Sequence, residues 1–463
     1  MKIAIAAVLI LSPVFSALGQ EVRNNQTVNG YRGIWFTLGQ FSEYGDKYSG
    51  GLGTYTAHHM PMAVYAKKVK KTFFVYGGTT ADQERHLLCM IGSYDHKKKT
   101  IALPVVVHDK GGVDDPHDNP SLMIDDAGYL WVFVSGRNTK RLGYKYRSLR
   151  PYDHSAFERI TEEEMTYPQP MFIPGRGYFH FFTKYTGVRE LYFETSPDGR
   201  TWSEDRKLAG IRKPSYEKSG HYQVSNHAKN KIFTFFNWHP DGNVDRRTNV
   251  YYVQTRDFGT TFTTADGETL GVPLENIASP ALVMDYAPQK KNVYLCDAVA
   301  DRKDNPVCLY VISDGHEPGP KNGFREWRVL FRQEGKWVDR KVADSDHNYD
   351  MGSLFIKGKT WRVIAPTDHG PQVYGAGGEI VVWESTNEGM TWRRKQQLTT
   401  HSDRNHNYVR RVVNGKSPFM YFWADGDPNK FSPSYLYIGD ERMRVRLLPY
   451  HMIENEQKLF RRN

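Results

Sequence analysis

Histidine recurs along this chain beside other side chains that can exchange protons or bind anions. His-Asn-Tyr occurs at His347 in "SDHNYDMGSL" and again at His406 in "RNHNYVRRVV". Earlier histidines also lead into apolar stretches, at His59, His117 and His221. Tyrosine and arginine follow closely, at Tyr349, Tyr408 and Arg410. If these side chains lie together at one site, a neutral His or Tyr could accept a proton while an Arg neutralises a carboxylate.

These residue types are the ones that β-elimination from a uronic acid requires. A cation must neutralise the C6 carboxylate so that the C5 proton becomes acidic. A neutral His or Tyr then removes that proton, and a second His or Tyr protonates the departing O4. Ordinary glycoside hydrolysis instead needs two carboxylic acids flanking the bond. The acids of "DDPHDNP" are close in sequence, but turn and capping roles are commoner for Asp.

The spacing of the histidines indicates a repeated structural unit. Gln169 and Ser279 lead into similar apolar stretches, so seven anchors follow one another roughly 58 residues apart. After each anchor comes an aromatic run bounded by turn residues, such as "KTFFVYGG", "YLWVFVSG" and "PFMYFWADG". Such β-branched and aromatic runs are typical of strands, and helical periodicity is nearly absent.

Seven units of three or four short strands predict an all-β chain that forms a seven-bladed β-propeller, with residues 21–463 as one domain. The innermost strands of such a fold converge on one channel, so residues that enter them meet at one mouth. The alternative is that these histidines only hydrogen-bond neighbouring blades. Residues 30–36 are expected to add a strand to the last blade, and the residues after about Ile438 to pack on the outside or to fray.

Three turns support the propeller. The stretches 196–202, 255–262 and 385–392 resemble the Asp-box turn of sialidase-type propellers, written "SPDGRTW", "TRDFGTTF" and "STNEGMTW" here. In such a turn an Asp or Asn side chain bonds backbone N–H groups, Gly adopts a positive φ, and an aromatic residue packs between sheets. These turns identify blades and are not expected to take part in catalysis.

Charge and the N-terminus limit the partners. Residues 1–20 are predicted to be a secretory signal peptide, with a buried strand or an anchor as the alternative, so the protein is expected to be secreted or periplasmic.

The net charge of +10 favours an anionic partner such as an acidic polysaccharide, although it could serve solubility alone. No nucleic-acid motif and no further apolar run long enough for a membrane span occurs. Elimination and hydrolysis need no cofactor; a structural calcium or zinc ion in the channel is an open alternative.

Several longer motifs point to a known group of proteins. They include "GYRGIWF", "DPHDNPSLMIDDAGYLWVFVSGR", "EMTYPQP", "FTKYTGVRELYF" and "GHYQV". Together they resemble the seven-bladed propellers with bacterial-neuraminidase-type repeats. That group contains ulvan lyases and the enzymes that act on terminal L-rhamnose-α-1,4-D-glucuronate of arabinogalactan. The resemblance runs from about Gly30 to Pro428.

The resemblance implies roles for individual residues. Ulvan lyases of this kind use a His that matches His117 and a second His whose place is taken here by Arg137. The catalytic Tyr and its Arg match Tyr185 and Arg189, with Arg246 and Arg247 as further candidates. The rhamnose-glucuronate enzymes rely on an early His, which matches His58 or His59. The predicted substrate-binding residues are completed by His221, His239, His347, Tyr349, His406 and Arg410.

The sequence therefore predicts an exported enzyme that cleaves a terminal rhamnose-glucuronate linkage of an acidic polysaccharide of arabinogalactan type, by elimination or hydrolysis. Ulvan lyase activity, which cleaves within the chain by elimination, is the neighbouring alternative. A propeller that binds acidic glycans without catalysis is the third.

Overall fold

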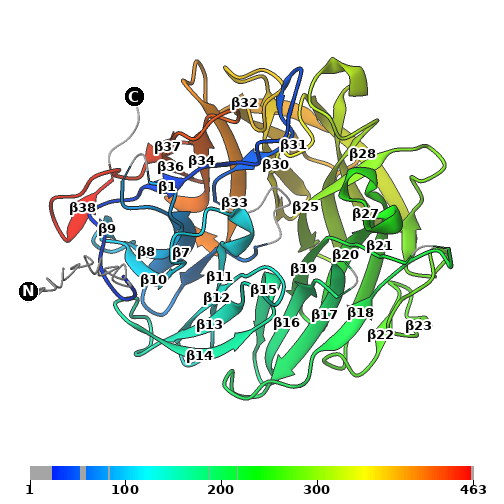
Figure 1. Ribbon diagram of the computed structural model, residues 1–463, viewed down its shortest axis with the longest axis horizontal. Helices are drawn as coiled ribbons and strands as arrows, with labels where there is room; N and C mark the ends of the chain where they lie inside the picture. Colours follow the sequence, from blue (N-terminus) through cyan, green and yellow to red (C-terminus); the bar gives the residue numbers. More distant parts are fainter. Residues whose placement is uncertain (1–22, 53–58, 82–83, 187, 216, 460–463) are drawn as a thin grey trace, which may run out of the picture.

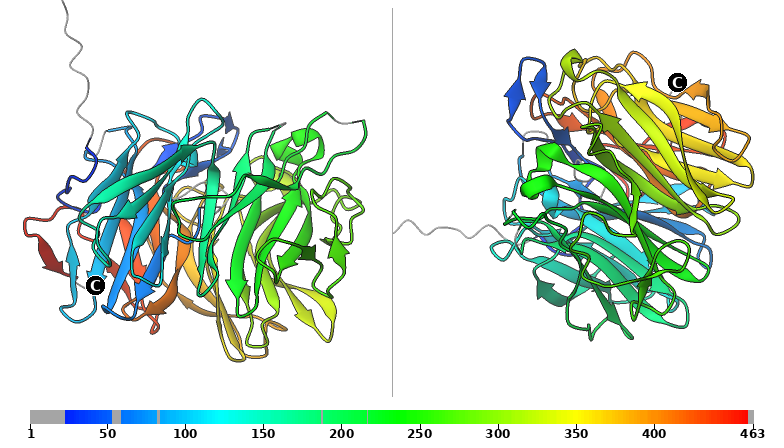
Figure 2. Two further views of the ribbon diagram at one scale, coloured as in Figure 1. Left: turned by 90° about the horizontal axis from the view of Figure 1, so that it is seen from below. Right: turned by 90° about the vertical axis from the view of Figure 1, so that its right-hand side faces the viewer.

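The computed structural model describes residues 23–52, 59–81, 84–186, 188–215 and 217–459. These residues form β-strands and four 3-10 helices, with no α-helix among them, which confirms the all-β prediction. Figure 1 shows the sheets following one another around a centre in chain order, so that the blue and red ends of the described chain meet at one side. In the side view of Figure 2 the strands run from one face of the molecule to the other. The arrangement is of propeller type.

Five sheets are antiparallel meanders. The first two are β11 (Pro120–Ile124), β12 (Leu130–Val134), β13 (Gly143–Ser148), β14 (Phe157–Glu163), and β15 (Thr166–Ile173), β16 (Gly177–Lys184), β17 (Glu190–Ser196), β18 (Arg206–Ala209). The third is β19 (Gln223–Ala228), β20 (Lys231–Trp238), β21 (Thr248–Thr255), β22 (Phe262–Thr263), β23 (Thr269–Leu270) and β24 (Leu282–Met284). The last two are β25 (Asn292–Ala300), β26 (Pro306–Ser313), β27 (Arg325–Gln333), β28 (Lys336–Ser345), and β29 (Ser353–Lys357), β30 (Thr360–Asp368), β31 (Glu379–Ser385), β32 (Arg393–Gln397).

The remaining large sheet has twelve strands and joins the two ends of the chain. Its N-terminal part contains β1 (Gly33–Ile34), β6 (Ala63–Ala66), β7 (Lys71–Gly78), β8 (Leu88–Asp95), β9 (Thr100–Ala102) and β10 (Val105–Asp109). Its C-terminal part contains β33 (Asn405–Lys416), β34 (Phe419–Gly426), β35 (Pro433–Ser434), β36 (Leu436–Gly439), β37 (Val445–Leu447) and β38 (Glu456–Lys458). Small pairs are formed by β2 (Phe36–Thr37) with β5 (Ser49–Gly50) and by β3 (Phe41–Ser42) with β4 (Gly45–Asp46). The 3-10 helices are η1 (Pro116–Asp118), η2 (Pro240–Gly242), η3 (Val244–Arg246) and η4 (Pro320–Asn322).

The strand sequences fit a fold in which each sheet is covered on both faces. All five residues of β12, "LWVFV", are buried, and so are seven of the eight residues of β7. Aromatic side chains fill the space between and along the strands, as in the stacked pair Phe179 and Phe193, whose ring centroids are 5.6 Å apart. Continuous apolar runs, rather than strict alternation, therefore mark these strands.

The first strand of each meander lies innermost, and these strands contact one another in a closed order. The contacts run from β6 to β11, β15, β19, β25, β29 and β33, and from β33 back to β6. The last contact includes one parallel bridge, Val413 with Val64, which joins the first and last meanders into the twelve-stranded sheet. Residues just before these strands consequently lie at one mouth of the central channel.

One anchor of the predicted repeat is wrong. Ser279 leads into β24, which pairs with β21 at the end of the preceding sheet and is not an innermost strand. The innermost strand of the next sheet is β25, which the repeat pattern places second, as the aromatic run that follows the anchor. Both are short apolar runs bounded by turn residues, so local pattern does not distinguish them.

Both chain ends contribute to closure. Gly33 and Ile34 in β1 pair with β35, and Gly33 also pairs with Gly78 in β7, so the predicted closing strand bridges the last and first meanders. After Ile438 the chain adds β37 to the last meander and then β38, which pairs with β9 of the first. The predicted signal peptide lies outside the described residues. No helix in the described part of the chain is long and apolar enough to cross a membrane.

The three Asp-box turns have the predicted geometry. In the first, Asp198 Oδ1 accepts hydrogen bonds from the N–H groups of Arg200 (2.8 Å) and Thr201 (2.7 Å), while Trp202 Nε1 donates to the Gly199 carbonyl (2.8 Å). Gly199 has a φ of +74°. The third turn repeats this pattern with Asn387 in place of Asp, because the amide oxygen accepts the same N–H bond from Thr391 (3.0 Å).

We expect Gly199→Ala to lower the free energy of unfolding more than Gly175→Ala does. Both glycines have nearly the same positive φ, +74° and +73°, so both substitutions should cost about 1 kcal/mol of backbone strain. A Cβ at Gly199 would lie 2.5 Å from the Trp131 side chain, whereas nothing lies within 4 Å of one at Gly175. The clash should add about 1 to 3 kcal/mol. Denaturant titration of both variants measures the difference, and equal losses would contradict the packing argument.

Candidate active site

The candidate site lies at the mouth where the innermost strands begin. His117 comes from η1, just before β11, and Tyr167 from the start of β15. Tyr185 and Arg189 come from the connection between β16 and β17, and Arg247 from the segment before β21. Four segments that are distant in sequence therefore meet at one place because the sheets that carry them are neighbours in the ring.

His117 is held by Asp115. Asp115 is the N-cap of η1: its Oδ1 accepts a hydrogen bond from the His117 backbone N–H (2.9 Å) and also from His117 Nδ1. Burial raises the pKa of Asp115, but its contacts with His117 and Arg141 outweigh burial and hold that pKa well below its usual range. The carboxylate therefore keeps the proton on Nδ1 of His117, and Nε2 is the ring nitrogen that can accept a proton.

Two arginines extend this pair toward solvent and toward Tyr185. Arg141 Nη2 donates to Asp115 Oδ2 at 2.6 Å, and Arg137 Nη1 donates to the same oxygen at 3.3 Å. The guanidinium of Arg137 also lies 5.9 Å from the centre of the Tyr185 ring, and its side chain is 42% exposed. Arg137 thus presents a cation to solvent while it contacts both Asp115, the partner of His117, and the Tyr185 ring.

Tyr185 is a half-buried phenol beside two cations. Burial and the nearby Tyr222 raise its pKa, whereas Arg189 and Arg137 lower it, and the result is a pKa of about 12. Arg189 lies against Tyr222, with its guanidinium 5.7 Å from the ring centre, and donates to the Gly242 carbonyl at 2.5 Å. The two arginines favour the tyrosinate, so Tyr185 is placed to exchange a proton.

Arg247 is fully buried in a cage of aromatic rings. Its guanidinium lies 5.0, 4.5 and 5.3 Å from the ring centres of Tyr222, Tyr294 and Tyr349, and Nη2 donates to the Tyr349 hydroxyl at 3.2 Å. Cation–π contacts of this kind stabilise a desolvated guanidinium. Arg246, next in sequence, is exposed at the end of η3 and points to solvent.

His59 supports His117 from below. It is fully buried, and its Nε2 donates to the His117 carbonyl oxygen at 3.0 Å. Burial lowers the pKa of His59 to about 3, so the ring is neutral. Its ring centre is 5.6 Å from that of Tyr167, which is itself 5.6 Å from the ring centre of His117. His58, the alternative in the rhamnose-glucuronate hypothesis, lies outside the described residues.

Three of the predicted substrate-binding histidines lie in the protein interior instead, each with both ring nitrogens bonded. His221 accepts from the Ile211 N–H (3.0 Å) and donates to the Asn237 carbonyl (2.8 Å). His406 accepts from Trp423 Nε1 (3.0 Å) and bonds Ser402 Oγ (2.9 Å). His347 accepts from the Tyr349 N–H (3.1 Å) and bonds the Asp46 backbone. These bonds hold segments of the protein together, and those of His406 lie within its own sheet and the loop before it.

The same bonds bear on the predicted channel metal. Burial lowers the pKa of His221 to about 4 and that of His347 to about 3, so both rings are neutral. Their nitrogens are already bonded within the protein, and an ion would have to replace those bonds. A calcium or zinc ion in the channel stays a prediction without support from these residues.

His239, another predicted substrate-binding residue, is buried beside the site. Its Nδ1 lies 3.4 Å from Arg189 Nη2, and its ring centre lies 4.7 Å from that of Tyr222.

Sequence reasoning missed several members of the site. Tyr167, Tyr222 and Tyr294 form its aromatic walls, and Asp115 and Arg141 orient His117. The motifs "EMTYPQP" and "GHYQV" contain Tyr167 and Tyr222, so the signal was present. Asp115 was assigned a turn or capping role, which is correct, but its bond to the imidazole of His117 gives it a second role.

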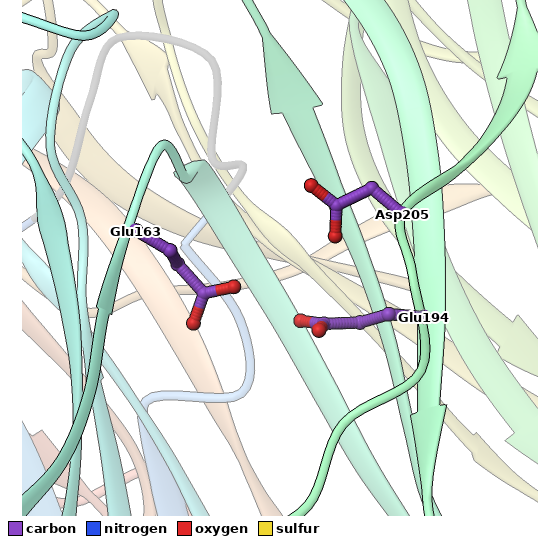
Figure 3. A group of neighbouring side chains, drawn as sticks. All are labelled: Glu163, Glu194 and Asp205. Atoms are coloured by element: carbon purple, nitrogen blue, oxygen red, sulfur yellow. The ribbon is translucent and has the colours of Figure 1, made fainter.

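Within the described residues, three carboxylates lie close enough to share a metal ion, namely Glu163, Glu194 and Asp205. Figure 3 shows them facing one another between the sheets of β11–β14 and β15–β18. The ammonium of Lys145, fully buried, already lies 2.6 Å from Glu163 and 2.8 Å from Glu194. The lysine supplies the positive charge that a metal would bring, so this cluster is an ionic link between two sheets.

We expect Lys145→Met to destabilise the protein, and more at pH 8 than at pH 5. Burial raises the pKa of Glu194 to about 7, and Lys145 opposes that rise. The folded state thus holds the Glu194 proton more tightly than the unfolded state, so its contribution to stability is full below about pH 4.5 and is lost as the pH rises through 7. Without Lys145 the buried Glu194 carboxylate lacks its cation, so the free energy of unfolding of the variant should continue to fall above pH 7. The total loss relative to the wild type should reach about 3 to 5 kcal/mol.

Urea denaturation at the two pH values measures this difference. The control is the double variant Lys145→Met with Glu194→Gln, which removes the uncompensated charge and should regain part of the stability at pH 8. A destabilisation that does not change with pH would contradict the ionic link.

Comparison with known proteins agrees with the geometry. Residues 54–345 match the model of the BNR repeat-containing family. An ulvan lyase from Nonlabens ulvanivorans is 23% identical over 397 residues, which cover 73% of this chain and 76% of the relative. A PL25 ulvan lyase bound to -[GlcA(1-4)Rha3S]- superposes with a TM-score of 0.71 at 16% identity, over 85% of this chain and 94% of that one. Polysaccharide lyase Uly1 superposes with a TM-score of 0.60 at 12% identity, over 91% and 100%. These solved structures share the fold.

Proposed function

Because the chain belongs to the BNR repeat-containing family, we propose that it is a polysaccharide lyase that cleaves an ulvan-type, uronate-containing polysaccharide by β-elimination. The observation that carries the proposal is the meeting of the Asp115–His117 pair, Arg137 and Tyr185 at one mouth. The names of the relatives, ulvan lyases, support the substrate class.

The architecture we propose is a seven-bladed propeller, in which the twelve-stranded sheet counts as the first and the last blade.

Arg137 and Arg189 would neutralise the substrate carboxylate. Elimination begins only when the charge that develops next to the C6 carboxylate is stabilised. The Arg137 side chain is 42% exposed, and it contacts both Tyr185 and Asp115, the partner of His117. The fully buried Arg247 would shape the site through its tyrosine cage without reaching the sugar.

His117 and Tyr185 would move the protons. One accepts the C5 proton; the electron pair of the broken C5–H bond forms the C4–C5 double bond, and the C4–O4 bond breaks as the other donates a proton to O4. His117 can accept through Nε2 because Asp115 fixes the proton on Nδ1. Tyr185, with a pKa of about 12, is protonated at neutral pH and suits the donor role.

The first prediction from the sequence is a substrate with the terminal rhamnose-glucuronate linkage of arabinogalactan. This substrate has weaker support than ulvan, because the relatives found are ulvan lyases. Its candidate residue His59 is buried beneath His117 and donates to the His117 carbonyl, which suits a supporting role. Ulvan and gum arabic offered side by side separate these substrates. Free rhamnose without an unsaturated product would indicate hydrolysis, and no product from either would favour a glycan-binding propeller.

We expect His117→Ala and Tyr185→Phe each to lower kcat/KM on ulvan by roughly 10² to 10⁴-fold, because each removes a proton-transfer group. The measurement is the rise in ultraviolet absorbance of the conjugated unsaturated uronate. His401→Ala, a change at an exposed histidine, is the matched control and should retain full activity. Circular dichroism and melting temperature check that the folds are intact. Wild-type turnover in a folded His117→Ala protein would remove this mechanism.

Arg137→Gln should move the pH dependence as well as the rate. The Arg137 cation lowers the pKa of Tyr185, so its removal raises that pKa, and any limb of the rate profile that reports Tyr185 should shift to higher pH. Arg137→Lys keeps the charge and should keep most of the wild-type profile. Profiles of kcat against pH for the three proteins provide the test; a uniform fall in rate with no shift would mean that Arg137 acts only in binding.

A further inference from the structure

Below the candidate active site, the central channel contains a separate cavity of about 280 Å³. It is lined by the far ends of the innermost strands, including Met171 in β15 and Asn226 in β19, with Asp126, His227 and Asn414 exposed at its rim. His117 lies before the start of β11, whereas Ile124, which lines this cavity, is its last residue. The cavity therefore opens toward the face opposite the candidate active site.

Arg410 in β33 extends into this cavity as a buried cation that forms no ion pair with a carboxylate of the described chain. The residue is 5% exposed, and its Nε and Nη2 have no hydrogen-bond partner within the described chain. Its guanidinium is 5.7 Å from the centre of the Tyr408 ring. Burial lowers the pKa of Arg410 to about 10, which leaves it charged at neutral pH. The predicted substrate-binding role of Arg410 does not fit this position, because the side chain lines the far cavity.

The nearest carboxylate is already committed. Asp297 lines the same cavity, but its Oδ1 accepts from the Ala298 N–H (2.9 Å) and its Oδ2 from the Leu354 N–H (3.0 Å). Arg411 also lines the cavity; it meets Asp297 only through a long 3.4 Å contact, and its Nε has no partner among the described residues. Two guanidinium groups thus offer unused N–H donors beside one another.

We propose that this cavity binds a small inorganic oxyanion, such as sulfate or phosphate, through the guanidinium of Arg410, with Arg411 as a second donor. Guanidinium groups bind tetrahedral oxyanions through paired N–H donors, and a buried charge is stable only when it is compensated. The anion would also support ring closure, because Val413 of the same strand forms the bridge to Val64. The site is independent of the lyase activity and of its substrate.

The test is the melting temperature of the full-length protein during a sodium sulfate titration, with ionic strength held constant by sodium gluconate. Sulfate stabilises most proteins weakly and without saturation, so the informative signal is a saturable component. We expect that component in the wild type and in the control Arg442→Met, an exposed arginine, and its loss in Arg410→Met. Without sulfate, Arg410→Met should melt no lower than the wild type, because an apolar side chain replaces an uncompensated buried charge.

The outcomes separate clearly. A saturable response that survives in Arg410→Met, or none in the wild type with either sulfate or phosphate, overturns the proposal. A saturable response to sodium chloride alone overturns the assignment to an oxyanion. If Arg410→Met does not fold, a selenate soak of wild-type crystals replaces it. An anomalous peak within hydrogen-bond distance of Arg410 Nη2 supports the site, and an empty cavity at saturating selenate overturns it.

Discussion

Closure of the ring of innermost strands is the constraint on which the candidate active site depends. Its side chains come from several sheets: His117 and Arg137 from the sheet β11–β14, Tyr185 and Arg189 from β15–β18, and the cage around Arg247 from later sheets. Closure relies on one parallel bridge between β33 and β6 and on side-chain contacts, with two further links where β1 joins β35 to β7 and β38 joins β9. Loss of these links would open the ring between its first and last sheets, although each sheet could keep its own hydrogen bonds.

Burial of positive charge is a recurring feature of this protein, and it is handled in three ways. Lys145 is compensated by carboxylates from two sheets. Arg247 lies among the faces of three tyrosine rings, which attract a cation while excluding water. Arg410 has no carboxylate partner among the described residues and lies near a single tyrosine ring, and for this reason we propose an external anion as its compensation. Each solution lies at a junction between sheets, where a charge that lost its partner would weaken the junction.

The site combines rigid support with exposed reactive groups. Asp115 serves both as the cap of η1 and as the partner of the His117 imidazole, so the backbone and the side chain are fixed by the same carboxylate. His59 adds a bond to the His117 carbonyl from below. Arg137 and Tyr185 remain partly open to solvent above this base. This arrangement keeps the solvent-facing groups above a His117 ring that is held in one orientation, as the proposed proton transfer would require.

The sequence by itself determined the all-β class, the repeat of strands and the Asp-box turns, because these follow from local patterns of aromatic residues, glycines and turn-forming side chains. It also indicated His117, Tyr185, Arg189 and Arg137 through motifs. Only the tertiary structure decided which polar residues face the mouth. His221 and His406 precede or begin strands much as His117 precedes one, yet their rings are bonded in the interior, and Ser279 begins a strand of the wrong sheet. The physical reason is that side-chain direction and sheet membership depend on pairing between distant strands, which short-range pattern does not specify.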